Sequence, residues 1–179
     1  MSDINKVLKT IKDKEVKFVD LRFTDSKGKW QHTAQTSSTI DESTFKDGIM
    51  FDGSSIAGWK NINESDMILM PDPKTAVMDP FTAQPQLILF CDVIEPADGK
   101  PYELDPRSTG KKAEEYLKKS GIGEKCFFGP EAEFFIFDDV KWSTDQEYTF
   151  FSIDSEEGAY NTGTEMEGGN LGHRPKDKG

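Results

Sequence analysis

The apolar positions near the start of the chain repeat with the period of an α-helix. Within residues 2–14 they stand at i, i+3, i+4 and i+7, as Ile4, Val7, Leu8 and Ile11. This spacing gathers them on one helix face, and Ser2 or Asp3 is available as the N-cap. The pattern therefore predicts an amphipathic helix that packs against a core.

The next segments alternate apolar and polar residues, as half-buried strands do. Residues 16–23 place their odd-numbered apolar side chains on one face, and after a turn residues 30–36 can return as the hairpin partner. Residues 86–94 are nearly all apolar, which predicts a central strand buried on both faces. Shorter strands are expected at 67–70, 75–78 and 148–154.

Residues 47–66 interrupt these patterns with glycines and serines, yet they contain apolar anchors. We expect an ordered loop because a flexible linker would lack such anchors. Asp52 lies in this loop beside Ser54 and Ser55. Two interpretations stay open: Asp52 and Gly53 form only the corner of a tight turn, or the carboxylate and the two hydroxyls hold a small cation such as ammonium.

The order of elements predicts an α+β fold in two parts. Residues 1–100 contain a helix, a hairpin and further strands, and the proline- and glycine-bearing segment 96–106 is the best candidate domain boundary. Residues 106–179 begin with a helix, capped by Ser108 or Thr109, that stops at Gly121. About 70 residues make a marginal core, and we expect that the sequence is cut off inside a loop rather than finished.

The predicted strand at 125–138 carries two carboxylates. Glu131 and Glu133 stand at i and i+2, so they point the same way, roughly 7 Å apart along the strand. Their neighbours are apolar on both faces, and two adjacent carboxylates in such a place need a positive charge between them. Mg²⁺, which takes oxygen ligands, would supply it. The alternative is that both glutamates lie at an open strand end and meet water.

Composition narrows the class of protein. The formal net charge is −11, which disfavours binding to nucleic acid, and no segment has the length of an apolar membrane span or the apolar core of a signal peptide. Cys91 and Cys126 stand in hydrophobic runs without a CxxC pairing, so we expect buried, reduced thiols and a cytoplasmic protein.

Several charged residues are expected to be solvent-exposed and without a catalytic role. His32 lies in a polar strand, and His173 lies beside Arg174 in a basic loop. Glu165 and Glu167 repeat the E-x-E spacing, but they stand in a glycine-rich loop without a strand pattern.

Six segments, in order from about residue 16 to the end, resemble bacterial type I glutamine synthetase. They are residues 51–59 (FDGSSIAGW), 63–67 (NESDM), 70–73 (MPDP), 102–107 (YELDPR), 128–135 (FGPEAEFF) and 172–175 (GHRP). The resemblance implies a β-grasp-like N-terminal domain at 1–100, followed by the truncated start of a catalytic α+β domain at 106–179. It also implies ATP-dependent ligation of ammonia to glutamate through γ-glutamyl phosphate.

The same resemblance assigns roles to single residues. Glu133 would ligate the metal nearer glutamate and Glu131 the metal that bridges the ATP phosphates, with two or more Mg²⁺ or Mn²⁺ ions per site. Asp52 would bind ammonium and take its proton, Ser54 would support the loop, and Asp66 would assist.

The family resemblance further implies a homo-oligomer of two stacked hexameric rings, a dodecamer. Its N-terminal loop completes the active site of a neighbouring subunit, so Trp59 is either an interface anchor or a core residue. Family members are longer by hundreds of residues, so we expect no ligase activity from residues 1–179 alone. Two alternatives remain: a glutamate–amine or polyamine ligase, and a non-catalytic β-grasp module that binds other subunits.

Overall fold

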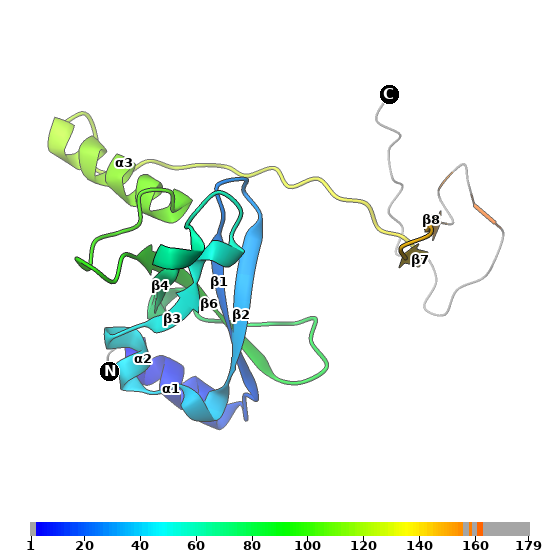
Figure 1. The fold of residues 1–179 in the computed structure, drawn as a ribbon, viewed down its shortest axis with the longest axis horizontal. Coiled ribbons are helices and arrows are strands. Elements are labelled where there is room, and N and C mark those ends of the chain that lie inside the picture. Colours follow the sequence, from blue (N-terminus) through cyan, green and yellow to red (C-terminus); the bar gives the residue numbers. More distant parts are fainter. Residues whose placement is uncertain (1–2, 156–157, 159–160, 163–179) are drawn as a thin grey trace. The chain divides into compact units, whose positions relative to one another are not determined.

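The computed structural model describes residues 3–155, 158, 161 and 162. It divides the chain into two compact units, Met1–Cys126 and Phe127–Gly179, called here the N-terminal and the C-terminal unit (Figure 1). Each unit is described by itself.

The N-terminal unit is a sheet with helices, in the α+β class that the sequence predicts. Its helices are α1 (Asp3–Asp13), α2 (Glu42–Lys46) and α3 (Pro106–Ser120), and its strands are β1 (Phe18–Thr24), β2 (Trp30–Thr36), β3 (Ile49–Asp52), β4 (Asp66–Pro71), β5 (Val77–Met78) and β6 (Gln86–Ile94). Short 3-10 helices cover Ser37–Thr39, Gly53–Ser55, Ile62–Glu64 and Pro73–Thr75. The helix at 2–14, the hairpin and the shorter strands are confirmed.

The sheet has the order β2-β1-β6-β4-β3, and β5 also pairs with β6. β1 and β6 run parallel, whereas the other neighbours are antiparallel. The apolar run predicted as a central strand is β6, which contacts three strands. The predicted loop at 47–66 is partly wrong, because β3 occupies its beginning. A strand of four residues between glycines is too short to show a clear alternation.

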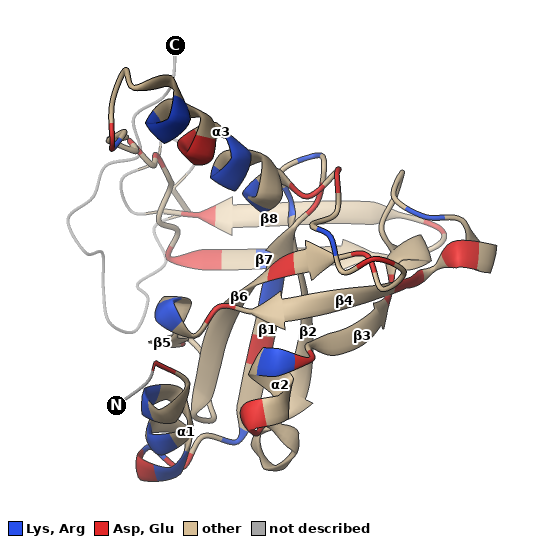
Figure 2. Ribbon diagram, turned by 90° about the vertical axis from the view of Figure 1, so that its left-hand side faces the viewer, with Lys and Arg blue, Asp and Glu red and all other residues tan. Residues whose placement is uncertain are grey.

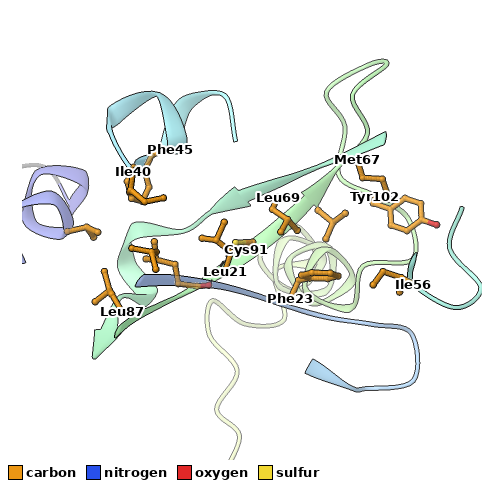
Figure 3. Close-up of a cluster of buried hydrophobic side chains, with 14 of the residues drawn as sticks. Leu21, Phe23, Ile40, Phe45, Ile56, Met67, Leu69, Leu87, Cys91 and Tyr102 are labelled. Carbon is orange, nitrogen blue, oxygen red and sulfur yellow. Dashed lines mark hydrogen bonds between the residues drawn. The ribbon is translucent and has the colours of Figure 1, made fainter. Parts of the chain in front are cut away.

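The core lies on one face of this sheet (Figure 3). Leu21 of β1, Leu69 of β4 and Leu89 of β6 are fully buried there. Val7 of α1 and Phe45 of α2 belong to the same cluster, so both helices cover this face. The apolar stripe of the first helix therefore packs as its spacing predicts.

The opposite face of the sheet carries a polar network in place of a second core. Asp20 is buried in β1, and its carboxylate accepts a hydrogen bond from Arg22 Nε at 2.7 Å and lies 2.7 Å from His32 Nδ1. Arg22 also reaches Asp79, at 3.1 Å. The side chain of His32 is mostly exposed, in agreement with its predicted surface position.

Asp105, rather than Ser108 or Thr109, is the N-cap of α3, which corrects the predicted cap. Its buried carboxylate accepts hydrogen bonds from the backbone N–H groups of Arg107 and Ser108. A carboxylate placed before the proline satisfies helix donors that a hydroxyl inside the helix could not reach. The helix ends at Gly121, in the left-handed region with φ 71°, as predicted.

The C-terminal unit contains one antiparallel hairpin, β7 (Asp139–Thr144) and β8 (Thr149–Asp154). The sequence analysis predicted β8 and missed β7. The predicted strand at 125–138 is wrong for this structure: residues 125–137 have no helix or strand, and Phe127 and Phe128 are each 88% exposed. An apolar strand needs neighbours on both sides and covers on both faces, and the described part of this unit offers only a hairpin.

Two further findings complete the fold. Cys91 is buried and Cys126 is exposed, so the expectation of two buried thiols is wrong for Cys126.

Within the part of the chain that the structure describes, no helix has the length and apolar character needed to cross a membrane.

Candidate functional site

Two of the predicted site residues meet at the base of one loop. β3 ends at Asp52 and β4 begins at Asp66, and the two residues are paired across the strands. The backbone N–H of Gly53 donates to the carbonyl oxygen of Ser65 at 2.7 Å. This bond closes a loop of residues 53–65, called here the 53–65 loop.

The hydrogen-bond pattern places Asp52 and Asp66 in the closer kind of cross-strand pair. A bond from Gly53 to Ser65 makes the Asp52–Asp66 pair a non-hydrogen-bonded one, the kind in which opposite side chains approach most closely. Both residues are exposed. Like charges placed directly opposite repel each other, so a cation between them is favoured.

The Asp52 carboxylate is held by the serines that follow it. Its Oδ1 accepts from the backbone N–H and the hydroxyl of Ser54, at 2.8 and 2.6 Å, and its Oδ2 accepts from Ser55 Oγ at 3.4 Å. The hydrogen bonds from Ser54 are the main reason that the pKa of Asp52 lies below its usual value. The residue therefore caps a tight turn, as the first interpretation expects, and is an ionised acceptor at neutral pH.

Glycine is required where the loop leaves β3. A Cβ on Gly53 would lie 2.4 Å from Met67 Sδ and 3.1 Å from the carbonyl oxygen of Ser65. Met67 is itself fully buried. The base of the loop is thus pressed directly onto the core, which fixes the backbone next to Asp52.

Trp59 anchors the middle of the loop in the core of its own unit. Its ring packs against Tyr102 and Phe23, with centroid distances of 5.0 and 5.6 Å, and its indole N–H donates to Ser26 Oγ at 3.0 Å. The hydroxyl of Tyr102 donates to the carbonyl oxygen of Trp59 at 3.1 Å. Of the two interpretations of this side chain, the structure supports the core.

An open pocket of about 570 Å³ adjoins this loop. It is lined by Lys60, Ile62, Asn63, Glu64, Ser65, Asp66, Glu95, Pro96 and Ala97. In Figure 2 the ribbon of the loop beyond β3 and β4 is red where it carries Asp or Glu. The lining holds three carboxylates and one ammonium group, so its charge favours a cation.

The structure does not assemble a metal site around Glu131 and Glu133. Both residues are exposed in the irregular segment of the C-terminal unit. Among the described residues, no group of three or more histidine, cysteine, aspartate or glutamate side chains could hold a metal ion. The two glutamates are the hard oxygen ligands that Mg²⁺ prefers, but they supply far fewer than its usual six or so.

Three residues weighed in the sequence analysis cannot be placed, and two contacts near the loop were not predicted. His173, Glu165 and Glu167 fall outside the described residues. The ion pair of Lys60 with Glu95 and the contact of Tyr102 with Trp59 were missed. They join residues far apart in the chain, and no local pattern signals such a contact.

Comparison with known proteins gives the family. The model of the glutamine synthetase β-grasp domain matches residues 15–96, and that of the glutamine synthetase catalytic domain matches residues 103–179. A glutamine synthetase of Rhizobium meliloti (strain 1021) is 60% identical over 100% of this chain and 38% of its own length. A protein of Cupriavidus pinatubonensis (strain JMP 134 / LMG 1197) named 3-hydroxylaminophenol mutase is 56% identical over 97% of this chain and 37% of its own length.

A solved structure agrees with this assignment. The cryo-EM structure of Plasmodium falciparum glutamine synthetase superposes with a TM-score of 0.64 and 26% identity, over 86% of this chain and 30% of that chain. The chain spans 38% of the length of the first curated relatives that it matches. It belongs to the glutamine synthetase family, of which it carries the β-grasp domain and part of the catalytic domain.

Proposed function

We propose that this chain is the N-terminal part of a longer glutamate–ammonia ligase, which makes glutamine, ADP and phosphate from glutamate, ammonia and ATP. The single observation that carries the proposal is the Asp52–Asp66 pair at the base of an ordered loop. The reaction is inferred from family membership. We propose that the paired carboxylates bind its nitrogen substrate. ATP first phosphorylates the side-chain carboxylate of glutamate, giving γ-glutamyl phosphate.

The two carboxylates act on ammonium, the main form of ammonia at neutral pH. Ser54 holds Oδ1 of Asp52 with two short hydrogen bonds, so Oδ2 is the oxygen better placed to accept from ammonium. Asp66 adds a second negative charge from the opposite strand. Because its pKa is low, Asp52 is ionised at neutral pH and is a weak base. Its protonation is therefore driven by the next step, which consumes ammonia.

The bond-forming step then balances. Ammonium gives one proton to Asp52 and becomes ammonia. The nitrogen lone pair attacks the carbonyl carbon of γ-glutamyl phosphate, and the carbon–oxygen bond to phosphate breaks. The nitrogen loses a second proton, which the departing phosphate takes up to leave as hydrogen phosphate, and the amide of glutamine remains. Asp52 then releases its proton to water and can accept a proton from the next ammonium ion.

Glu131 and Glu133 are proposed as metal ligands of the longer protein. Their carboxylates fit Mg²⁺ or Mn²⁺ in kind but not in number. When bound, two or more such ions neutralise phosphate charge and orient the γ-phosphoryl group. We infer that the strand at 125–138 forms only beside the strands that the rest of a catalytic domain would supply.

We further propose a cytoplasmic homo-oligomer, a dodecamer of two hexameric rings, with domains at 1–100 and from 106 onward. In it, the 53–65 loop would complete a neighbouring subunit's active site. The exposure of Asp52 and Asp66 supports this, because both carboxylates face away from their own core. The free thiols of Cys91 and Cys126 agree with a reducing compartment.

The test uses a full-length protein that carries residues 1–179. Purified protein is supplied with glutamate, ATP and Mg²⁺, and then with ammonium, methylamine or putrescine, while ADP and the amide product are measured. We expect glutamine from ammonium at the highest kcat/KM, and no product from residues 1–179 alone. A higher kcat/KM with an amine would support the amine-ligase alternative, and no product with any nitrogen donor would support the non-catalytic module.

A further inference from the structure

One ion pair ties the middle of the 53–65 loop to the residue that follows the central strand β6. Lys60 Nζ lies 2.6 Å from Oε1 of Glu95, the residue that follows β6. The side chains are 19% and 28% exposed, so the pair is far less solvated than most pairs on this surface. Reduced solvation strengthens the attraction between opposite charges, since water screens it less.

The surroundings of Lys60 keep the pair charged. Its Nζ lies 5.2 Å from the centroid of the Tyr102 ring, within the range of a cation–π contact. The hydrogen bond to Glu95 is the main reason that the pKa of Lys60 lies above its usual value. The ammonium group is therefore protonated at neutral pH.

A second set of contacts holds the loop next to this ion pair. Trp59, the preceding residue, is fixed by Tyr102 and Ser26. Together these contacts hold the loop halfway between its two ends, at which Asp52 and Asp66 stand. Lys60 and Asp66 also line the same pocket. The structure thus links the position of Lys60 to the geometry of the two facing carboxylates.

We propose that Lys60 is a positioning residue for the nitrogen substrate: its ion pair with Glu95 holds the 53–65 loop so that Asp52 and Asp66 engage one ammonium ion together. This inference rests on the proposed function. Lys60 acts through the loop and does not touch the substrate. A competing effect has the opposite sign, because a nearby positive charge repels ammonium and its removal would tighten binding.

Enzyme kinetics separate the two effects. In the full-length protein, Lys60→Met removes the charge and keeps most of the stem, and Lys60→Arg restores the charge. The matched control is Lys100→Met, which breaks a 2.7 Å pair with Asp98 that is 76% and 45% exposed. We expect Lys60→Met to raise KM for ammonium about tenfold, a change of about 1.4 kcal/mol, with kcat and KM for glutamate and ATP within twofold.

The outcomes decide between the proposals. Lys60→Arg is expected to recover most of the ammonium KM, and Lys100→Met to match the parent protein. An unchanged or lowered KM in Lys60→Met overturns the positioning role alone. If the unmodified full-length protein makes no glutamine from ammonium, the proposed function fails and the positioning role falls with it.

A second measurement serves if Lys60→Met prevents assembly of the full-length protein. Hydrogen exchange is followed on the 179-residue chain at the amides of Gly53, Ile56 and Trp59, which bond within or at the base of the loop. In Lys60→Met and in Glu95→Gln we expect at least tenfold faster exchange there, with unchanged exchange in β6. Lys100→Met should leave all of them unchanged, and equal loop exchange in every variant overturns the inference.

Discussion

Asp52 at the end of β3 stands directly opposite Asp66 at the start of β4, as a non-hydrogen-bonded pair. Trp59 anchors the loop between them in the core. Natural sheets seldom place like charges opposite each other without a compensating charge. We therefore expect that a cation between these two residues is favoured.

Neutralising either carboxylate should weaken ammonium binding, and Asp52 should matter more. Asp52→Asn in the full-length protein removes both the charge and the proton acceptor, so we expect kcat/KM for ammonium to fall about a thousandfold. Asp66→Asn removes only an assisting charge, and about a tenfold fall is expected. Initial rates with varied ammonium measure both. Equal losses in the two variants would contradict the assignment of the proton acceptor to Asp52.

The same pair should lower the stability of the isolated chain. Asp66→Asn removes a like-charge contact across the strands, so the free energy of unfolding of the 179-residue chain should rise by about 0.2–1 kcal/mol. Urea unfolding followed by circular dichroism measures it. Glu64→Gln, in the same loop but outside the paired strands, is the control and should change little. A less stable Asp66→Asn variant would show that the repulsion is already relieved.

Replacing Gly53 by alanine should be destabilising. The new Cβ would meet Met67 Sδ at 2.4 Å inside a packed core, so we expect a loss of about 1–3 kcal/mol in the free energy of unfolding. Gly110→Ala is the matched control, because Gly110 lies within α3 with nothing within 4 Å of its would-be Cβ. That change should add about 0.5–1 kcal/mol. The same sign for both variants would be inconsistent with the close approach at Gly53.

The depressed pKa of Asp52 gives a pH dependence with a defined sign. A carboxylate whose pKa is lowered by folding stabilises the protein above its unfolded pKa, and this stabilisation is lost as pH falls through the folded value. Ser54→Ala removes the largest cause, so the pKa of Asp52 should move up toward 3.8 and acid unfolding should begin at a higher pH.

Carboxyl ¹³C NMR titration and acid unfolding measure these shifts. Ser55→Ala is the control, since Ser55 makes only the longer 3.4 Å contact with Asp52. We expect a smaller shift from this variant than from Ser54→Ala. Equal shifts in the two variants would mean that Ser54 does not dominate the pKa of Asp52.

The two thiols should differ sharply in reactivity. Cys91 is buried, and burial raises the pKa of its thiol well above the ordinary value, so it should be nearly inert in the folded chain. Cys126 is exposed. Labelling with a maleimide should therefore modify one thiol quickly and the second only after denaturation. Cys126→Ser should abolish the rapid phase, and rapid labelling of Cys91 in that variant would disagree with the fold.

Local patterns in the sequence predicted most of the N-terminal unit. The helical spacing of Ile4, Val7, Leu8 and Ile11 gave α1, and the apolar run at 86–94 gave the central strand β6. In each of these elements, the order of apolar and polar residues indicates which positions are buried. The same patterns predicted a strand around Glu131 that the structure lacks, because a strand also needs neighbours.

The sequence by itself determined the family, most of the helices and strands of the first hundred residues, and the candidacy of Asp52, Ser54 and Asp66. Only the tertiary structure decided that Asp52 faces Asp66, that Trp59 lies in its own core, and that Lys60 reaches Glu95. Strand register and contacts between distant residues depend on how elements pack together. That packing is a property of the whole unit, and no short stretch of sequence encodes it.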